Sequence, residues 1–325
     1  MRAVLCKQYG LPDTLVVEDI PSLVPAPGQV VISMKAAGVN FPDSLIIQGK
    51  YQMKPPLPFS PGCELAGVVK LVSEGVKHIK PGDAVIAYAS WGAFAEEVAV
   101  DARACIPLPP GVDFKVGASF MMAYGTSYHA LKDRAQLKAG DTLLVLGAAG
   151  GVGSAAVELG KLLGARVIAA ASSDAKLEAC RQLGADATIN YASEDLREAV
   201  KRISAGKGVD VVYDPVGDKF AEPAMRDMAW GGRYLVIGFA GGEIPKIPLN
   251  LPLLKGFSIV GVFWGSFTRK EPQKSEANVR ELLGWIAGGK LRPLVSAAYP
   301  LAQAARALKD VMERNVKGKV VLVTG

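Results

Sequence analysis

The stretch 147-GAAGGVG-153 decides the fold, because it separates an apolar run from an amphipathic one. TLLVL (142–146) precedes it and has the composition of a buried strand. SAAVELGKLLGA (154–165) follows it, with helical spacing of its apolar residues and a glycine near its end. A glycine-rich turn between a strand and a helix lets backbone N–H groups approach a phosphate. The sequence therefore predicts a dinucleotide site that begins only in the middle of the chain.

Each glycine of this turn has its own predicted task. Gly147 permits a tight exit from the strand, and Gly153 lets the helix pack closely on the sheet. Gly150 and Gly151 let the backbone approach a pyrophosphate. Two alanines fill the first part of the turn, so the spacing departs from a strict G-x-G-x-x-G. No Gly-Lys-Ser or Gly-Lys-Thr follows, which excludes a P-loop.

Strand-like and helix-like segments alternate after the loop. The expected strands are ARVIAAA (165–171), ATIN (187–190), VDVVYDPVG (209–217), GRYLVIG (232–238) and SIVGVFWG (258–265), and helices are expected over 174–184, 194–204 and 221–230. This alternation predicts a doubly wound parallel sheet, which is a Rossmann domain. Further helices are expected near 275–288 and 301–313, and GKVVLVTG (318–325) closes the chain as a strand.

Before residue 121 the pattern is different, with short β-rich runs between Pro- and Gly-rich turns. The runs are QVVISMKAAGV (29–39), LAGVVKLV (65–72), DAVIAYA (83–89) and FAEEVAV (94–100). Closely spaced short strands of this kind predict a barrel or a distorted sheet. The fold class is therefore α/β, with a β-barrel domain joined to a doubly wound one.

Composition limits the class of protein. With 325 residues, half of them apolar, the chain is long enough for two domains with separate cores. A net charge of +6 permits anionic ligands, but the Lys and Arg residues are scattered, so we expect no nucleic-acid partner. The four cysteines are far apart and the N-terminus lacks a signal-peptide core. We therefore expect a soluble cytoplasmic protein without membrane spans.

The end of the second Rossmann strand indicates which dinucleotide binds. A site for NAD requires Asp or Glu there to bond the ribose hydroxyls, whereas this strand ends in AAASSDAK (169–176). Ser172, Ser173 and Lys176 supply hydroxyl donors and positive charge, which suit the 2′-phosphate of NADPH. The alternative is that Asp174 serves a ribose or only caps the helix that it begins.

Several motifs together resemble the medium-chain dehydrogenase/reductase superfamily, and more narrowly its zinc-free quinone oxidoreductase (zeta-crystallin) family. They are GVNFPDSLIIQGKY (38–51), PFSPGCELAGVV (58–69), KPGD (80–83), AYGTSYHAL (123–131), GAAGGVG (147–153), LGAD (183–186) and INY (189–191). The resemblance implies a GroES-like catalytic domain from residues 1–121 and 263–325, and a Rossmann NADPH-binding domain over 122–262.

The resemblance also implies that no metal takes part. Zinc-dependent relatives have Cys where this chain has Asn40 and His where it has Cys63, and the chain contains only two histidines. Zinc needs three or four converging ligands. The expected reaction is therefore metal-free hydride transfer from NADPH to an acceptor that is already electrophilic, such as a quinone or an α,β-unsaturated carbonyl.

Three residues match positions that line the nicotinamide–substrate cleft in the family: Asn40, Asp43 and Tyr51. Asn40 and Tyr51 would donate hydrogen bonds to the oxygen that gains negative charge during reduction. Structural alternatives remain open, since Asn40 can cap a turn, Asp43 can complement a helix dipole, and Tyr51 can be a half-exposed aromatic. Some relatives carry a second Tyr where this chain has Leu45, which puts a two-tyrosine scheme in doubt.

A larger set of residues matches the cofactor-binding positions of the family. The set is Thr126, Gly147, Gly150, Gly151, Val152, Gly153, Ser172, Ser173, Lys176, Tyr191, Gly238, Phe239, Phe263, Trp264 and Arg314. Structural alternatives exist here too: Thr126 can be an ordinary helix residue, Arg314 a solvated one, and aromatic side chains at strand ends a part of the core or of a dimer interface.

Two alternative functions stay open on the sequence. The basic charge balance tolerates a coenzyme A thioester, so the protein can be an enoyl-CoA or acryloyl-CoA type reductase. It can also be a non-catalytic NADPH-binding protein of the crystallin kind. In either case the apolar strand SIVGVFWG (258–265) should not stay open to solvent at a sheet edge, which predicts a homodimer.

Overall fold

The computed structural model describes residues 1–324, which form two compact units. The first unit comprises Met1–Met122 and the described residues from Pro293 onward, and the second comprises Ala123–Arg292. Helix α2 (Phe114–Tyr128) begins in the first unit and ends in the second. None of the helices over residues 1–324 combines the length and the apolar character that crossing a bilayer requires.

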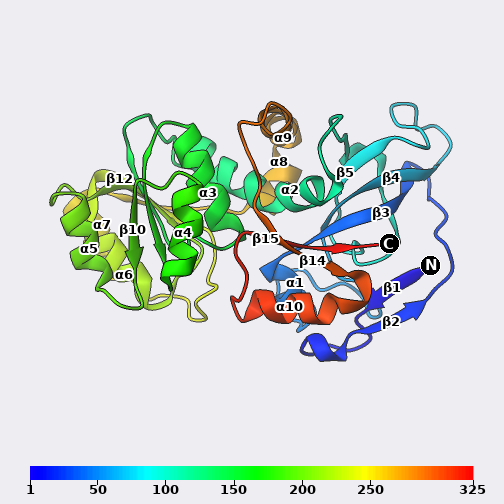
Figure 1. The fold of residues 1–325 in the computed structure, drawn as a ribbon, viewed down its shortest axis with the longest axis horizontal. Helices are drawn as coiled ribbons and strands as arrows, with labels where there is room; N and C mark the ends of the chain where they lie inside the picture. Colours follow the sequence, from blue (N-terminus) through cyan, green and yellow to red (C-terminus); the bar gives the residue numbers. More distant parts are fainter. Residues whose placement is uncertain (325) are drawn as a thin grey trace. The chain divides into compact units, whose positions relative to one another are not determined.

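A six-stranded parallel sheet forms the centre of the second unit (Figure 1). Its strands are β8 (Thr142–Val145), β9 (Arg166–Ala171), β10 (Ala187–Asn190), β11 (Val209–Asp214), β12 (Met228–Val236) and β13 (Ser258–Gly261). They lie in the order β10-β9-β8-β11-β12-β13. Counted along the chain this is 3-2-1-4-5-6, the order of a Rossmann sheet, so the doubly wound prediction is confirmed.

Helices cover this sheet and bury its apolar strands. They are α3 (Gly151–Leu162), α4 (Asp174–Gln182), α5 (Leu196–Ile203), α6 (Ala221–Arg226) and α7 (Asn250–Lys255). Leu144, Ile168 and Val212 are fully buried in the core beneath them. The helix expected over 221–230 was predicted too long. It ends at Arg226, because Met228 is buried and pairs with Val209 at the start of β12.

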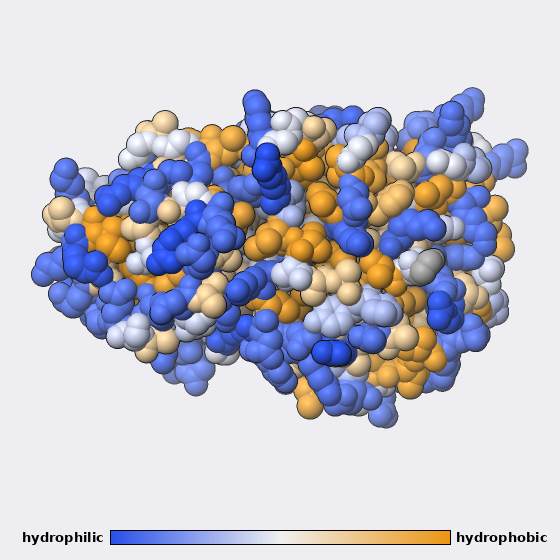
Figure 2. All heavy atoms as spheres, viewed as in Figure 1, coloured by the Kyte–Doolittle hydropathy of each residue, from blue (hydrophilic) through white to orange (hydrophobic). Residues whose placement is uncertain are grey.

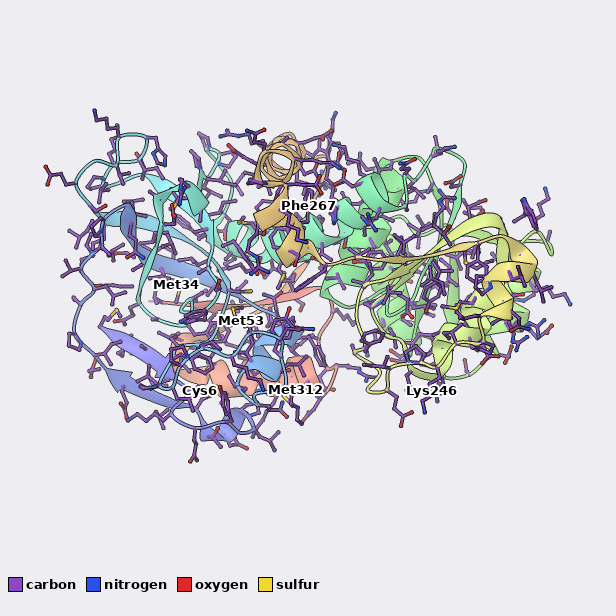
Figure 3. The ribbon with its side chains drawn as sticks, turned by 180° about the vertical axis from the view of Figure 1, so that it is seen from behind. Cys6, Met34, Met53, Lys246, Phe267 and Met312 are labelled. Atoms are coloured by element: carbon purple, nitrogen blue, oxygen red, sulfur yellow. The ribbon has the colours of Figure 1, made fainter. Side chains whose placement is uncertain are left out.

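Residues 263–292 belong to the second unit, whereas the sequence analysis assigned them to the catalytic domain. They form α8 (Trp264–Lys270) and α9 (Pro272–Ala287), and the strand expected over 258–265 ends earlier, at Gly261. The packing explains the difference. The His129 ring stacks on Phe267, labelled in Figure 3, with 3.8 Å between ring centroids, and Asn278 donates to the Asp133 carboxylate at 2.9 Å.

The first unit is built on a mainly antiparallel sheet in the order β14-β15-β3-β4-β5-β7, with β6 also paired to β3. Its strands are β3 (Gln29–Val39), β4 (Glu64–Val72), β5 (Ala84–Tyr88), β6 (Glu97–Asp101), β7 (Cys105–Pro107), β14 (Val295–Pro300) and β15 (Lys319–Val323), beside a small pair, β1 (Arg2–Leu5) and β2 (Val16–Asp19). Register shifts between β3 and β4 bend this sheet.

Apolar side chains fill the space between this sheet and two helices. The helices are α1 (Phe41–Ile46) and α10 (Ala304–Met312), the second preceded by a 3₁₀ turn over Leu301–Gln303. Met34 of β3 is almost fully buried in this core, and the partly buried Met53 packs against the same core (Figure 3). The sequence-based expectation of a β-rich first domain is confirmed.

Candidate functional site

The glycine loop occupies the junction of β8 and α3. Gly147 has a φ of +56°, and its carbonyl oxygen accepts from Gly150 N at 2.9 Å to close the turn. A Cβ atom on Gly153 would lie 2.2 Å from the Gly147 oxygen, which no side chain tolerates. Gly150 is the N-cap of α3, so the first-turn N–H groups of Gly151, Val152 and Gly153 have no acceptor within the helix. N–H groups of this kind are available to bind an anion.

Neighbouring elements hold this loop in place. Ser127 of α2 donates from Oγ to the Val152 carbonyl at 2.9 Å and lies 2.8 Å from the fully buried Tyr213 hydroxyl. The Asp214 carboxylate accepts from Val216 N and Gly217 N at the end of β11. Burial raises the pKa of Asp214, although these hydrogen bonds oppose the rise. The two turns that meet where the strand order reverses are therefore both fixed.

At the end of β9 a small polar group stands where an NAD site would carry a carboxylate. Ser172 is exposed, Ser173 is the N-cap of α4, and the Lys176 ammonium lies 3.2 Å from Ser172 Oγ. Asp174 accepts from Asn190 Nδ2 at 2.9 Å, so one of its oxygens joins α4 to β10. The structure thus places Ser172, Ser173 and Lys176 close together at the end of β9.

Other predicted cofactor residues have different surroundings. Tyr191 packs on Phe220 with 4.4 Å between ring centroids. Trp264 is buried against Gly125 of α2, where a Cβ would lie 2.8 Å from the indole ring. Thr126 is half-buried in α2, Gly238 and the partly exposed Phe239 follow β12, and Phe263 is half-exposed. Arg314 belongs to the first unit, where it follows α10 in the left-handed conformation.

The first unit contains a buried polar cluster that lies over three paired strands. Gly38, Glu64 and Tyr88 are in register across β3, β4 and β5, so their side-chain positions face one side of the sheet. A Cβ atom on Gly38 would lie 2.4 Å from Glu64 Oε1. The glycine therefore makes the space that the Glu64 carboxylate fills.

Asn40 is enclosed by this cluster. Its Nδ2 donates to Glu64 Oε1 at 2.9 Å, and its Oδ1 accepts from the Lys319 ammonium. The Lys319 ammonium also lies 2.8 Å from Glu64 Oε1. Sequence reasoning did not select Glu64 or Lys319. A charged residue inside the apolar run CELAGVV (63–69) was the available signal, because an ionised side chain is rarely buried without a partner.

Asp43 is fully buried at the third position of α1. Its Oδ2 accepts from Asn40 N at 2.8 Å, while its Oδ1 has no hydrogen-bond partner. Burial raises the pKa of this carboxyl to about 7, against the opposing effects of the Asn40 hydrogen bond and of Lys319. The group therefore changes its protonation state near neutral pH, and one of its oxygens is uncommitted.

Three weakly acidic groups lie close enough to interact electrostatically with Asp43. They are Tyr51, Cys63 and Tyr88. Burial raises the pKa of the half-buried Tyr51 phenol, and the neighbouring acidic groups Cys63 and Asp43 raise it further. Burial also raises the pKa of the Cys63 thiol well above its usual value, so this cysteine stays neutral. Asn40, Asp43 and Tyr51 thus belong to one cluster in the first unit.

Comparisons with known proteins identify the domain families of the two units. Residues 26–110 match the alcohol dehydrogenase GroES-like domain and residues 151–284 match the zinc-binding dehydrogenase domain. The quinone oxidoreductase-like protein 2 homolog of Nematostella vectensis is 38% identical over 99% of this chain and 89% of its own length.

Two solved structures are similar over nearly their whole length. A probable oxidoreductase from Mycobacterium abscessus is 40% identical with a TM-score of 0.90, covering 99% of this chain and 98% of that one. Escherichia coli quinone oxidoreductase complexed with NADPH is 31% identical with a TM-score of 0.92, covering 99% and 100%.

A GroES-like unit joined to a Rossmann sheet defines a medium-chain dehydrogenase/reductase. Within that superfamily the chain belongs to the quinone oxidoreductase family, and it is an oxidoreductase of that type. One matched domain is described as zinc-binding, yet within residues 1–324 no group of three or more His, Cys, Asp or Glu side chains could hold a metal ion.

Proposed function

We propose that the protein is an NADPH-dependent oxidoreductase that transfers hydride, without a metal, to quinones or α,β-unsaturated carbonyls. The observation that carries the proposal is the glycine loop, whose tight turn leaves the first N–H groups of α3 open to a pyrophosphate. An acceptor conjugated to a carbonyl needs no Lewis acid, because conjugation delocalises the negative charge that hydride addition creates.

The second unit supplies groups that fit NADPH. Ser172, Ser173 and Lys176 offer hydroxyl donors and an ammonium for the 2′-phosphate at the end of β9. Asp174 is held by Asn190, so its carboxylate supports β10 and α4. The related Escherichia coli enzyme has NADPH bound. We also propose that the cofactor contacts a further set of residues: Tyr191, Gly238, Phe239, Phe263 and Arg314.

NADPH supplies the hydride when it is bound. The first unit then has to stabilise the oxygen that gains charge and to provide a proton. Asp43 fits the second task because its Oδ1 is uncommitted and its pKa of about 7 leaves much of the carboxyl protonated at neutral pH. Tyr51, a neutral phenol near Asp43, can donate to the oxygen. Asn40, whose amide is bound by Lys319 and Glu64, holds Asp43 in place.

The residues of this cluster do not fit zinc. Asn40 Oδ1 and Glu64 Oε1 are both bound by the Lys319 ammonium, which would repel a second cation at the same oxygens. The Cys63 thiol is held neutral, whereas a metal ligand has to be a thiolate. A metal-bound alkoxide route for alcohols is therefore not part of the proposal.

Steady-state rates with NADPH and a panel of acceptors test the proposed reaction. We expect turnover with quinones or free enones, inhibited neither by chelators nor by extended dialysis. Turnover confined to an enoyl-CoA thioester would transfer the assignment to the acyl-CoA class. Absence of turnover with every conjugated acceptor, at saturating NADPH, would refute the reductase and leave a non-catalytic NADPH-binding protein.

We also propose a homodimer through the β13 edge of the second unit. β13 pairs with β12 on one side and is the last strand of the described sheet. Apolar side chains are exposed around it: Trp230 of β12 (82%), Leu253 (77%) and Leu254 of α7 (69%), and Ile259 of β13 (41%). An apolar strand edge of this kind invites pairing with a second copy.

Light scattering on variants tests the dimer. Ile259→Lys adds a charge at the strand edge and should produce monomers at micromolar concentration. Val24→Lys is the control, because Val24 is also an exposed apolar residue (83%) but lies in the first unit, so this variant should stay dimeric. A wild-type protein that is monomeric at this concentration would refute the proposal.

A cytoplasmic location remains a prediction of the sequence. Hydrophilic residues are spread over the face drawn in Figure 2, with apolar residues between them.

A further inference from the structure

The Lys319–Glu64 ion pair lies in the first unit beside the predicted catalytic residues, but none of the preceding roles explains it. The two side chains are 3% and 1% exposed, and Nζ lies 2.8 Å from Oε1. Two charges removed from water to this degree are stable only when their hydrogen-bonding capacity is used in full. The hydrogen bonds of each group therefore show which neighbouring residues the ion pair holds in position.

The Lys319 ammonium has three protons and three acceptors. They are Glu64 Oε1, Asn40 Oδ1 and the Val39 carbonyl, the last at 3.3 Å. Two of these three acceptors belong to Asn40 and to the residue before it. Because all its donors are committed, Lys319 cannot itself donate to a substrate. Its position at the start of β15, opposite the end of β3, fixes the place where β3 turns into α1.

The Glu64 carboxylate is committed as well. Oε1 accepts from Lys319 and from Asn40 Nδ2, and Oε2 accepts from Met122 N at 2.8 Å. Lys319 thus donates to the oxygen of the Asn40 side-chain amide, and Glu64 accepts from its nitrogen. Asn40 in turn donates from its backbone N–H to Asp43 Oδ2. The chain of contacts leads from the ion pair to the carboxyl with the uncommitted oxygen.

We propose that Lys319 and Glu64 are positioning residues, which orient Asn40 and set the affinity of Asp43 for its proton. The inference rests on the proposed reduction, for which Asp43 is the proton donor. The cation and the anion act on Asp43 in opposite directions, since Lys319 lowers its pKa and Glu64 raises it. Other titratable groups that interact with Asp43 are Tyr51, Cys63 and Tyr88, each neutral at pH 7 because burial raises its pKa.

The opposed signs give a test that general damage to the fold cannot imitate. Activity should fall as the pH rises through the pKa of Asp43, because the protonated form is the donor. We call this fall of kcat/KM with rising pH the limb of the pH profile. In Lys319→Met the limb should move to higher pH by about one unit or more. In Glu64→Gln it should move to lower pH. Lys319→Arg, which keeps the charge, should leave the limb near its wild-type position.

Two controls keep the result interpretable if a single variant folds poorly. The double variant Lys319→Met/Glu64→Gln leaves neither charge unpaired and should place the limb between those of the single variants. Lys70→Met breaks the Lys70–Glu97 pair (2.5 Å) elsewhere in the same unit and should leave the limb in place. NADPH binding, followed by fluorescence titration, should be equal in all variants.

A readout that needs no turnover separates this inference from the proposed function. The Asp43 side-chain carbon, titrated by ¹³C NMR in the full chain without cofactor, should show the same opposed shifts. If the wild type reduces no acceptor but these shifts occur, the proposed reaction is refuted and the positioning role of Lys319 and Glu64 is not. If neither the NMR transition nor the kinetic transition moves in the two single variants, the positioning role is refuted.

Discussion

Gly153→Ala tests the glycine loop most directly, because one methyl group is added where the structure has no room. The new Cβ would lie 2.2 Å from the Gly147 oxygen and 2.9 Å from Ala148 Cα. Both neighbours are backbone atoms, so no side-chain rotation relieves the contact. Restoring a separation of 3.0 Å from the oxygen requires a shift of about 0.8 Å between the start of α3 and the turn.

The size of this shift sets the expected loss of cofactor binding. A hydrogen bond of 2.9 Å lengthened by about 0.8 Å passes the distance at which it contributes. One lost bond between an N–H group and a charged phosphate costs about 1.5–3 kcal/mol, which is a factor of about 10 to 150 in affinity. We therefore expect the Kd for NADPH to rise at least about tenfold, measured by the fluorescence of the bound nicotinamide.

Gly284→Ala is the matched control, since it adds the same methyl to α9, where a Cβ meets nothing within 4 Å. It should bind NADPH as the wild type does. A Gly153→Ala protein that melts at the wild-type temperature and keeps wild-type affinity would refute the reasoning. It would mean that the N–H groups of this turn do not hold the phosphates.

Three further predictions concern other parts of the molecule. Lys176→Ala removes the ammonium beside Ser172 and should weaken NADPH binding about tenfold while leaving NADH binding unchanged, as competing titrations would reveal; equal losses for both would refute a 2′-phosphate contact. Asp43→Asn should abolish the fall in kcat/KM above about pH 7, because an amide has no proton to lose, and a surviving limb would assign it to another group. Gly284→Ala should raise the free energy of unfolding by about 0.5–1 kcal/mol at an exposed helix position, and a lower denaturation midpoint would contradict this.

The sequence alone was sufficient for the parts of the fold that depend on local pattern. The glycine loop, the alternating strands and helices of the Rossmann sheet and the β-rich first unit follow from runs of neighbouring residues, whereas the strand order is known only from the structure. The segment after Gly261 was harder, because Phe263 and Trp264 continue an apolar run that resembles a strand. In the structure Trp264 begins α8, since its ring is buried against Gly125.

The candidate site was only half visible in the sequence for a related reason. Asn40, Asp43 and Tyr51 lie within one short motif, so they could be found together. Lys319 and Glu64 are 255 residues apart, and nothing in their local context shows that they meet. Their pairing depends on the register of β15 against β3, which is a tertiary contact. Such contacts leave no periodic trace in a single sequence.

The path of the chain has a consequence for its synthesis. The second unit is one continuous segment, whereas the first is built from two segments that flank it, with β15 lying against β3. During synthesis the Rossmann sheet can therefore be complete before Lys319, the cationic partner of Glu64, has been added. A nascent or shortened chain that ends before β15 therefore leaves Glu64 without its ion-pair partner in the first unit.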